Sequence, residues 1–121
     1  MSKEKPLDEK TWNRTASVTH VPYGYSKTLA EQAAWVIAGS QSQWRHCTIN
    51  PNFICGPEVK YHESSESFKL IKSLESNDPS IALGVRDLGI GRVDVREVAE
   101  AHIAAAYLEE AAGRHVLFGY P

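Results

Sequence analysis

The feature that most constrains the fold is the alternation of helix-like and strand-like stretches along the chain. Apolar residues recur at spacings of three and four, as on one face of a helix, over residues 23–40, 64–76 and 95–112. Short apolar runs typical of strands occupy residues 45–50, 81–83 and 115–118. Such alternation is typical of α/β proteins with parallel strands. We therefore predict a single α/β domain over residues 1–121, with an irregular N-terminal segment over 1–22.

Local signals predict where the helices begin and end. Pro22 stands just before the first helix and Gly39 at its end, both usual positions for these residues. Asp94 is a good N-cap for the last helix, with Glu97 placed to complete a capping box, and Gly113 is its natural C-cap. The apolar stripe expected to face the core from the first helix comprises Tyr25, Leu29, Ala33, Val36 and Ile37.

Bulk composition excludes several classes of function. The 121 residues carry a net charge of −2, which gives no field to attract nucleic acid or an acidic membrane. No apolar run is long enough to cross a bilayer, and the charged N-terminus is not a signal peptide, so we expect a cytoplasmic protein. Cys47 and Cys55 fit no zinc pattern, and the five histidines lack a zinc-ligand spacing. We therefore expect reduced cysteines and no metal site.

The best candidates for chemistry are Tyr23 and Lys27. Their spacing of four at the start of a helix places both side chains on one face. A lysine ammonium beside a phenol stabilises the phenolate, and a phenol so tuned can pass a proton to a carbonyl oxygen. The positive end of the helix dipole acts at the same place. Many surface helices carry such a pair by chance, so the alternative interpretation is a solvated helical turn.

The surroundings of this pair resemble one family. The stretch 23–35 (YGYSKTLAEQAAW) resembles the catalytic helix of the extended short-chain dehydrogenases/reductases, especially the dihydroflavonol, cinnamoyl-CoA and aldehyde reductases. Further resembling stretches follow the family's order, namely 8–12 (DEKTW), 49–57 (INPNFICGP), 92–102 (RVDVREVAEAH) and 113–117 (GRHVL). The resemblance implies an incomplete Rossmann-like parallel sheet with flanking helices, plus part of a small substrate-side lobe.

The resemblance also implies roles for individual residues. Tyr23 would be the proton donor, and Lys27 would bind the cofactor ribose and tune Tyr23. Pro51 with its neighbours Asn52 and Phe53 would lie against the nicotinamide, partly through main-chain groups. The implied activity is reduction of a small-molecule carbonyl substrate with hydride from NADP or NAD in reduced form. The sequence leaves the choice of cofactor and the substrate open.

One motif of that family does not occur in these 121 residues. The Gly-rich turn that lets a backbone approach a cofactor pyrophosphate has no counterpart here, since Gly84, Gly89 and Gly91 have the wrong spacing. This argues against firm cofactor binding by this chain alone and predicts little or no unaided activity. The alternative hypothesis is a non-catalytic, truncated relative that self-associates or binds a partner. In either case we expect a homo-oligomer or a complementing chain that covers exposed apolar faces.

Overall fold

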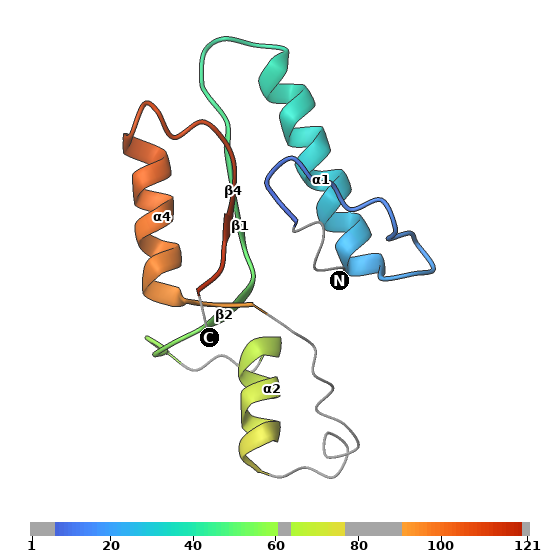
Figure 1. Cartoon of the computed structure of the whole chain (residues 1–121), viewed down its shortest axis with the longest axis vertical. Helices are drawn as coiled ribbons and strands as arrows, with labels where there is room; N and C mark the ends of the chain where they lie inside the picture. Colours follow the sequence, from blue (N-terminus) through green and yellow to red (C-terminus); the bar gives the residue numbers. More distant parts are fainter. Residues whose placement is uncertain (1–6, 61–63, 77–90, 120–121) are drawn as a thin grey trace. The chain divides into compact units, whose positions relative to one another are not determined.

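The computed structural model describes residues 7–60, 64–76 and 91–119. Helices and strands alternate along the chain, as the sequence predicts (Figure 1). In chain order they are α1 (Pro22–Gly39), β1 (Cys47–Pro51), β2 (Phe53–Cys55), α2 (Glu66–Glu75), β3 (Arg92–Asp94), α4 (Val95–Tyr107) and β4 (Gly113–Leu117). The predicted strand at 81–83 and the glycines at 84 and 89 lie outside the described residues.

The chain divides into two compact units, each with its own pair of strands. The first unit comprises Met1–Asn50 and His102–Val116, and in it β1 pairs with β4. The two strands run side by side in the same direction (Figure 1). The second unit comprises Pro51–Ala101 and Leu117–Pro121, and in it β2 pairs in parallel with β3. Parallel strands joined through helices are those of an incomplete Rossmann-like α/β fold, as predicted. The expectation of a single domain stays a prediction.

The second unit holds the most buried apolar side chains of the described residues. Val93 on β3 is 4% exposed and lies in register with Ile54 on β2, and Val98 on α4 is 8% exposed. Gly56, which follows β2, has a φ of 136°, and a Cβ there would lie 2.8 Å from a methyl of Val95. A glycine is therefore required where the end of β2 meets the first turn of α4.

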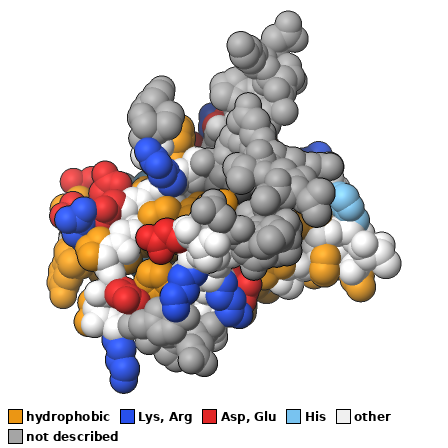
Figure 2. All heavy atoms as spheres, turned by 90° about the horizontal axis from the view of Figure 1, so that it is seen from below, with side chains coloured by type: hydrophobic (Ala, Val, Ile, Leu, Met, Phe, Trp, Pro, Cys, Tyr) orange, Lys and Arg blue, Asp and Glu red, His pale blue; other side chains and the backbone are white. Residues whose placement is uncertain are grey.

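In the first unit, α1 packs through a different face from the predicted one. Its half-buried positions lie along one side of the helix, and they are Gly24, Tyr25, Thr28, Glu31, Ala34, Trp35 and Ala38. Leu29, Val36 and Ile37, which the apolar stripe placed toward the core, are exposed. Of the predicted stripe, Tyr25 is half-buried, but the prediction was wrong for the other four residues, because polar contacts of Glu31 and Trp35, described below, orient the helix. Figure 2 shows hydrophobic side chains at the surface, interspersed with charged ones.

The last helix ends earlier than its sequence predicts. The prediction extended it to residue 112 with Gly113 as the cap, but α4 ends at Tyr107. The guanidinium of Arg45 donates to the main-chain carbonyls of Ala105 (3.2 Å) and Glu109 (2.6 Å), so a distant side chain satisfies groups at this helix end. Gly113 instead opens β4 with a φ of 95°.

Smaller differences concern the ends of the other elements. Pro22 is the first residue of α1 rather than the residue before it, and Ser40 follows Gly39 in a right-handed conformation. The strand predicted at 45–50 begins at Cys47 and that predicted at 115–118 begins at Gly113. The three-residue strand β3 was not predicted. Its pairing with β2 is what makes it a strand, and a single sequence does not show that pairing.

Candidate active site

Tyr23 and Lys27 lie together at the start of α1, as their spacing predicts. The Lys27 Nζ atom is 5.5 Å from the centroid of the Tyr23 ring, within the range of a cation–π contact. The Tyr23 side chain is 73% exposed, so an incoming molecule can reach its hydroxyl. Pro22 at the first helical position sets the start of this turn. The geometry therefore supplies an accessible phenol with a cation beside it.

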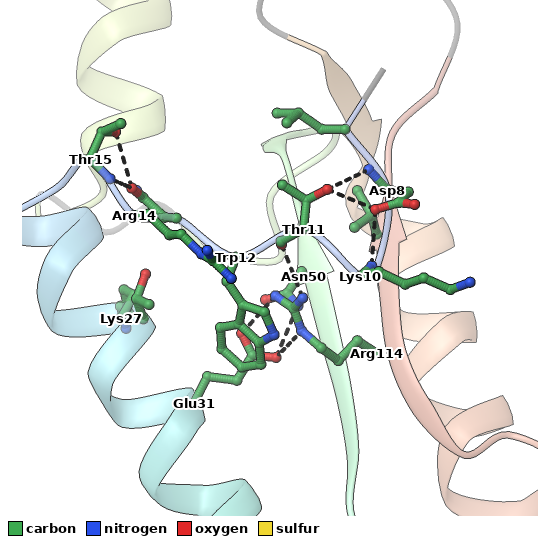
Figure 3. A pocket seen from close by; sticks show the side chains of 14 residues that line it. Asp8, Lys10, Thr11, Trp12, Arg14, Thr15, Lys27, Glu31, Asn50 and Arg114 are labelled. Carbon is green, nitrogen blue, oxygen red and sulfur yellow. Dashed lines mark hydrogen bonds and ion pairs between the residues drawn. The ribbon is translucent and has the colours of Figure 1, made fainter. Parts of the chain in front are cut away.

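Lys27 also lines a cavity of about 920 Å³ within the first unit (Figure 3). The N-terminal segment 7–15 forms one wall, and the rest of the lining comes from α1, β1 and β4. Asn50 from β1 and Arg114 from β4 point into the region beside Trp12 (Figure 3). One charged end of the candidate pair thus faces a space large enough for a small organic molecule.

An ion pair between Glu31 and Arg114 organises this cavity. The Arg114 Nε and Nη2 atoms donate to the two Glu31 carboxylate oxygens at 2.6 and 3.2 Å, and the side chains are only 16% and 12% exposed. Glu31 also accepts from Trp35 Nε1 (3.4 Å) and Asn50 Nδ2 (3.5 Å). Burial raises the pKa of Glu31, but hydrogen bonds from Arg114 and Trp35 outweigh it and hold that pKa below its usual value.

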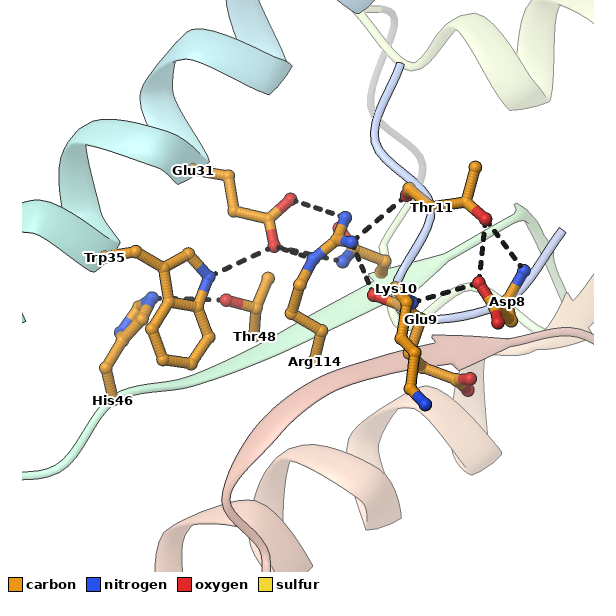
Figure 4. Close-up of polar contacts among 10 residues, drawn as sticks. Asp8, Glu9, Lys10, Thr11, Glu31, Trp35, His46, Thr48 and Arg114 are labelled. Carbon is orange, nitrogen blue, oxygen red and sulfur yellow. Dashed lines mark hydrogen bonds and ion pairs between the residues drawn. The ribbon is translucent and has the colours of Figure 1, made fainter. Parts of the chain in front are cut away.

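Arg114 connects the same ion pair to the N-terminal segment (Figure 4). Its Nη1 atom donates to the main-chain carbonyls of Glu9 (2.6 Å) and Thr11 (3.1 Å), and its guanidinium lies 3.9 Å from the centre of the Trp12 ring. Sequence reasoning did not identify Glu31 or Arg114 as site residues. Both lie in stretches that resemble the reductases, but 83 positions separate them and no local pattern pairs them.

The other predicted cofactor contacts, Pro51, Asn52 and Phe53, belong to the second unit. The Asn52 amide donates to the Leu117 carbonyl (2.9 Å), and the Phe53 amide donates to the Gly91 carbonyl (3.2 Å). Both main-chain donors are therefore engaged within the sheet. Their contact with a nicotinamide stays a prediction, and it would fall to side chains and rings rather than to these two amides.

The second unit contains a cavity of its own, of about 800 Å³. Its walls come from β2 and the loop after it, from α2 and from the first turns of α4, and its apolar lining includes Ile54, Phe68, Ile71, Val95 and Ala99. Arg96 lies in this lining and pairs with Asp94 at 2.6 Å. Lys60 and Glu58 also lie in the lining, and a largely apolar cavity with a few charged groups suits a molecule that carries both an apolar body and a polar group.

The described residues hold neither a metal site nor a helix suited to a membrane. No group of three or more His, Cys, Asp or Glu side chains in 7–60, 64–76 and 91–119 is arranged to hold a metal ion. Within the same ranges, none of the helices has the length and apolar character that crossing a membrane requires.

Comparison with known proteins supports the resemblance seen in the sequence. Reductases that the chain matches include cinnamoyl-CoA reductase CAD2 of Medicago truncatula, with 30% identity over 90% of this chain and 32% of the relative. The NADPH-dependent methylglyoxal reductase GRE2 of Saccharomyces cerevisiae is 30% identical over 94% of this chain and 35% of the relative. The anthocyanidin reductase of Vitis vinifera is 30% identical over 91% of this chain and 35% of the relative.

The chain spans about a third of the length of these curated relatives. No solved structure matches it significantly. A family model described as "NAD dependent epimerase/dehydratase family" matches residues 1–119, which is nearly the whole chain. The paired tyrosine and lysine, the parallel strands and this match agree, and the chain belongs to the NAD-dependent epimerase/dehydratase family.

Proposed function

We propose that this chain is the proton-donor portion of an NAD(P)H-dependent carbonyl reductase, with Tyr23 as the acid and Lys27 as the residue that tunes it. The observation that carries the proposal is the Lys27 ammonium, 5.5 Å from the ring of an exposed Tyr23 at the start of α1. Relatives named as cinnamoyl-CoA, methylglyoxal and anthocyanidin reductases support the same class of reaction.

The residues around the pair fit a nicotinamide cofactor. Among the described residues, no carboxylate forms an ion pair with Lys27, so its ammonium is available to the hydroxyls of a ribose. Bound NADPH or NADH would supply the hydride. Lys27 would hold the ribose, and Tyr23 would lie beside it.

The proposed chemistry of this chain is a single proton transfer. As a hydride reaches the carbonyl carbon, the Tyr23 hydroxyl gives its proton to the carbonyl oxygen, and an alcohol results. The tyrosine is left as a phenolate, whose negative charge the Lys27 ammonium and the amino end of α1 stabilise. A small-molecule aldehyde or ketone is the substrate class that this step converts to an alcohol. A thioester carbonyl would give a hemithioacetal, which yields an aldehyde when its C–S bond breaks and the thiol leaves with the hydroxyl proton.

The exposed apolar side chains favour a second candidate function. Leu29, Val36 and Ile37 face outward from α1, which suits a module that self-associates or binds a partner without hydride transfer. The two candidates differ in whether the chain binds cofactor. A single titration with cofactor therefore distinguishes the two candidate functions.

The test is a titration of the chain with NADPH and NADH, read by energy transfer from its three tryptophans, followed by assays with methylglyoxal and cinnamoyl-CoA. If the proposal holds, binding saturates and Tyr23→Phe lowers turnover by about 100-fold or more, the usual contribution of a positioned acid. Tyr107→Phe is the matched control, because Tyr107 is also an exposed helical tyrosine but has no such lysine contact described. Equal activity of Tyr23→Phe and the parent would overturn the assignment, and no binding up to millimolar cofactor would favour the second candidate.

A further inference from the structure

Lys27 and Glu31 are placed to pair with each other. They are four residues apart on α1, and on a helix residues at this spacing are neighbours whose opposite charges attract. The structure instead joins Glu31 to Arg114 of β4, while the Lys27 ammonium lies near the Tyr23 ring. Arg114 has therefore taken the place beside the Glu31 carboxylate that Lys27 could otherwise occupy.

Geometry and burial explain why Arg114 is the preferred partner. It meets the carboxylate with two nitrogen atoms, an arrangement that a lysine ammonium cannot reproduce. The two side chains lie in a part of the molecule with little exposure to water, whereas Lys27 is exposed, and exposed pairs are weak. Glu31 accepts further bonds from Trp35 and Asn50, which hold its carboxylate on the side of the helix that faces the strands.

We propose that Arg114 is a positioning residue for the Tyr23–Lys27 pair, because it binds the Glu31 carboxylate and so keeps that carboxylate from pairing with the Lys27 ammonium. This inference rests on the proposed function, since it concerns the tuning of the same proton donor. Arg114 touches neither Tyr23 nor Lys27 in the described contacts and acts through Glu31 alone.

Removal of Arg114 leaves a poorly solvated carboxylate without its cation. A charge in that position is costly, and it is relieved when the side chain turns toward the neighbouring ammonium on the same helix. Lys27 is then drawn away from Tyr23, and a negative charge takes a place near the phenol. Both changes disfavour the phenolate. When the Glu31 carboxylate is removed together with Arg114, neither change takes place.

The test follows the ionisation of the Tyr23 phenol by carbon NMR of the chain labelled at tyrosine Cζ, with Tyr23→Phe identifying the signal. In Arg114→Met we expect the midpoint of the Tyr23 titration to rise by a few tenths of a pH unit, the size of an exposed helical ion pair. In the double variant Arg114→Met/Glu31→Gln we expect the midpoint to return to that of the parent. Should the enzyme be active, its pH profile should move in the same order.

Arg45→Met is the matched control. Arg45 also anchors the first unit through its guanidinium, but it donates to main-chain carbonyls and not to a carboxylate. We expect it to lower the melting temperature and leave the Tyr23 midpoint unchanged. If Arg114→Met does not fold, Arg114→Gln replaces it, since glutamine removes the charge but keeps a polar side chain that can form hydrogen bonds.

The proposal is overturned if the folded Arg114 variants leave the midpoint unmoved, or if adding Glu31→Gln fails to restore it. The titration needs no turnover and no cofactor. A chain without reductase activity still gives a readable result, so failure of the proposed function and failure of this inference are distinguishable.

Discussion

Val21 precedes the candidate site in a backbone conformation that its side chain disfavours. Its φ and ψ are 52° and 57°, in the left-handed region, and it is the one non-glycine residue of the described ranges with a positive φ. A β-branched residue rarely adopts this region, and the residue before a proline is biased toward extended conformations. We infer that strain is held at the last residue before α1, two residues before Tyr23.

Val21→Gly should therefore stabilise the chain, because glycine adopts a positive φ without a steric penalty. We expect the free energy of unfolding to rise by about 1 kcal/mol, the left-handed penalty less the entropy that glycine adds to the unfolded chain. Urea titration followed by circular dichroism measures it. Val18→Gly is the control, since Val18 is also an exposed valine of the same segment but has no positive φ, and there the change should be destabilising. A loss of stability in both variants would show that Val21 is not strained.

At the level of single residues, the sequence predicts the candidate pair but not its supports. Tyr23 and Lys27 are four apart on one helix, so local geometry alone brings them together. Trp12 lies against the Arg114 guanidinium and so links the N-terminal segment to β4. The Glu31–Arg114 pair joins a helix to the final strand and could not be predicted, because only the tertiary fold brings these residues together.

Among the elements, α4 has the clearest local start. Asp94 accepts a hydrogen bond from the amide of Arg96 (2.8 Å) and the Glu97 carboxylate accepts from the Asp94 amide (3.2 Å), which confirms the predicted capping box. The Arg96 side chain also donates to Asp94, and these bonds lower the pKa of Asp94 to about 2. The cap is therefore strongest when this carboxylate is ionised.

This shift predicts how α4 responds to acid. The folded-state pKa of Asp94 lies below its ordinary value of 3.8, so its contribution to stability is complete above about pH 4 and is lost as the pH falls toward 2. Asp94→Asn should remove that part of the pH dependence, which thermal unfolding at intervals from pH 5 to 2 measures. Glu110→Gln is the control, since its carboxylate has no ion pair in the described part of the chain. Parallel curves for Asp94→Asn and the parent would contradict the prediction.

Some helix and strand ends are determined by residues close in the sequence, and others by residues far away in the sequence. Ser65 accepts from the amide of Phe68 at the start of α2, and Asp94 caps α4, so both starts follow from nearby residues. The end of α4 depends on Arg45, about sixty positions earlier, and the strand β3 exists only through its pairing with β2. Contacts of this second kind leave no local pattern in a single sequence.

At the scale of the whole chain, few apolar side chains are buried. Val93 and Val98 are the buried apolar residues of the described ranges, whereas many large apolar side chains are exposed. The second unit holds this small core, whereas the first relies on half-buried side chains and on polar contacts such as those of Arg45 and Arg114. Exposed apolar area of this kind favours association, because its burial removes it from water. The expectation of a homo-oligomer therefore applies to the face of α1 that the fold leaves uncovered.

We expect the chain to associate with itself through that face, and sedimentation velocity over a range of concentrations measures it. Val36→Lys places a charge in the exposed stripe that also holds Leu29 and Ile37, where desolvation on association is unfavourable. It should raise the dissociation constant at least tenfold, about 1.4 kcal/mol. Val59→Lys is the control, because Val59 is fully exposed in the other unit. A chain that stays monomeric at every concentration would refute self-association, and equal weakening by both variants would place the contact elsewhere than α1.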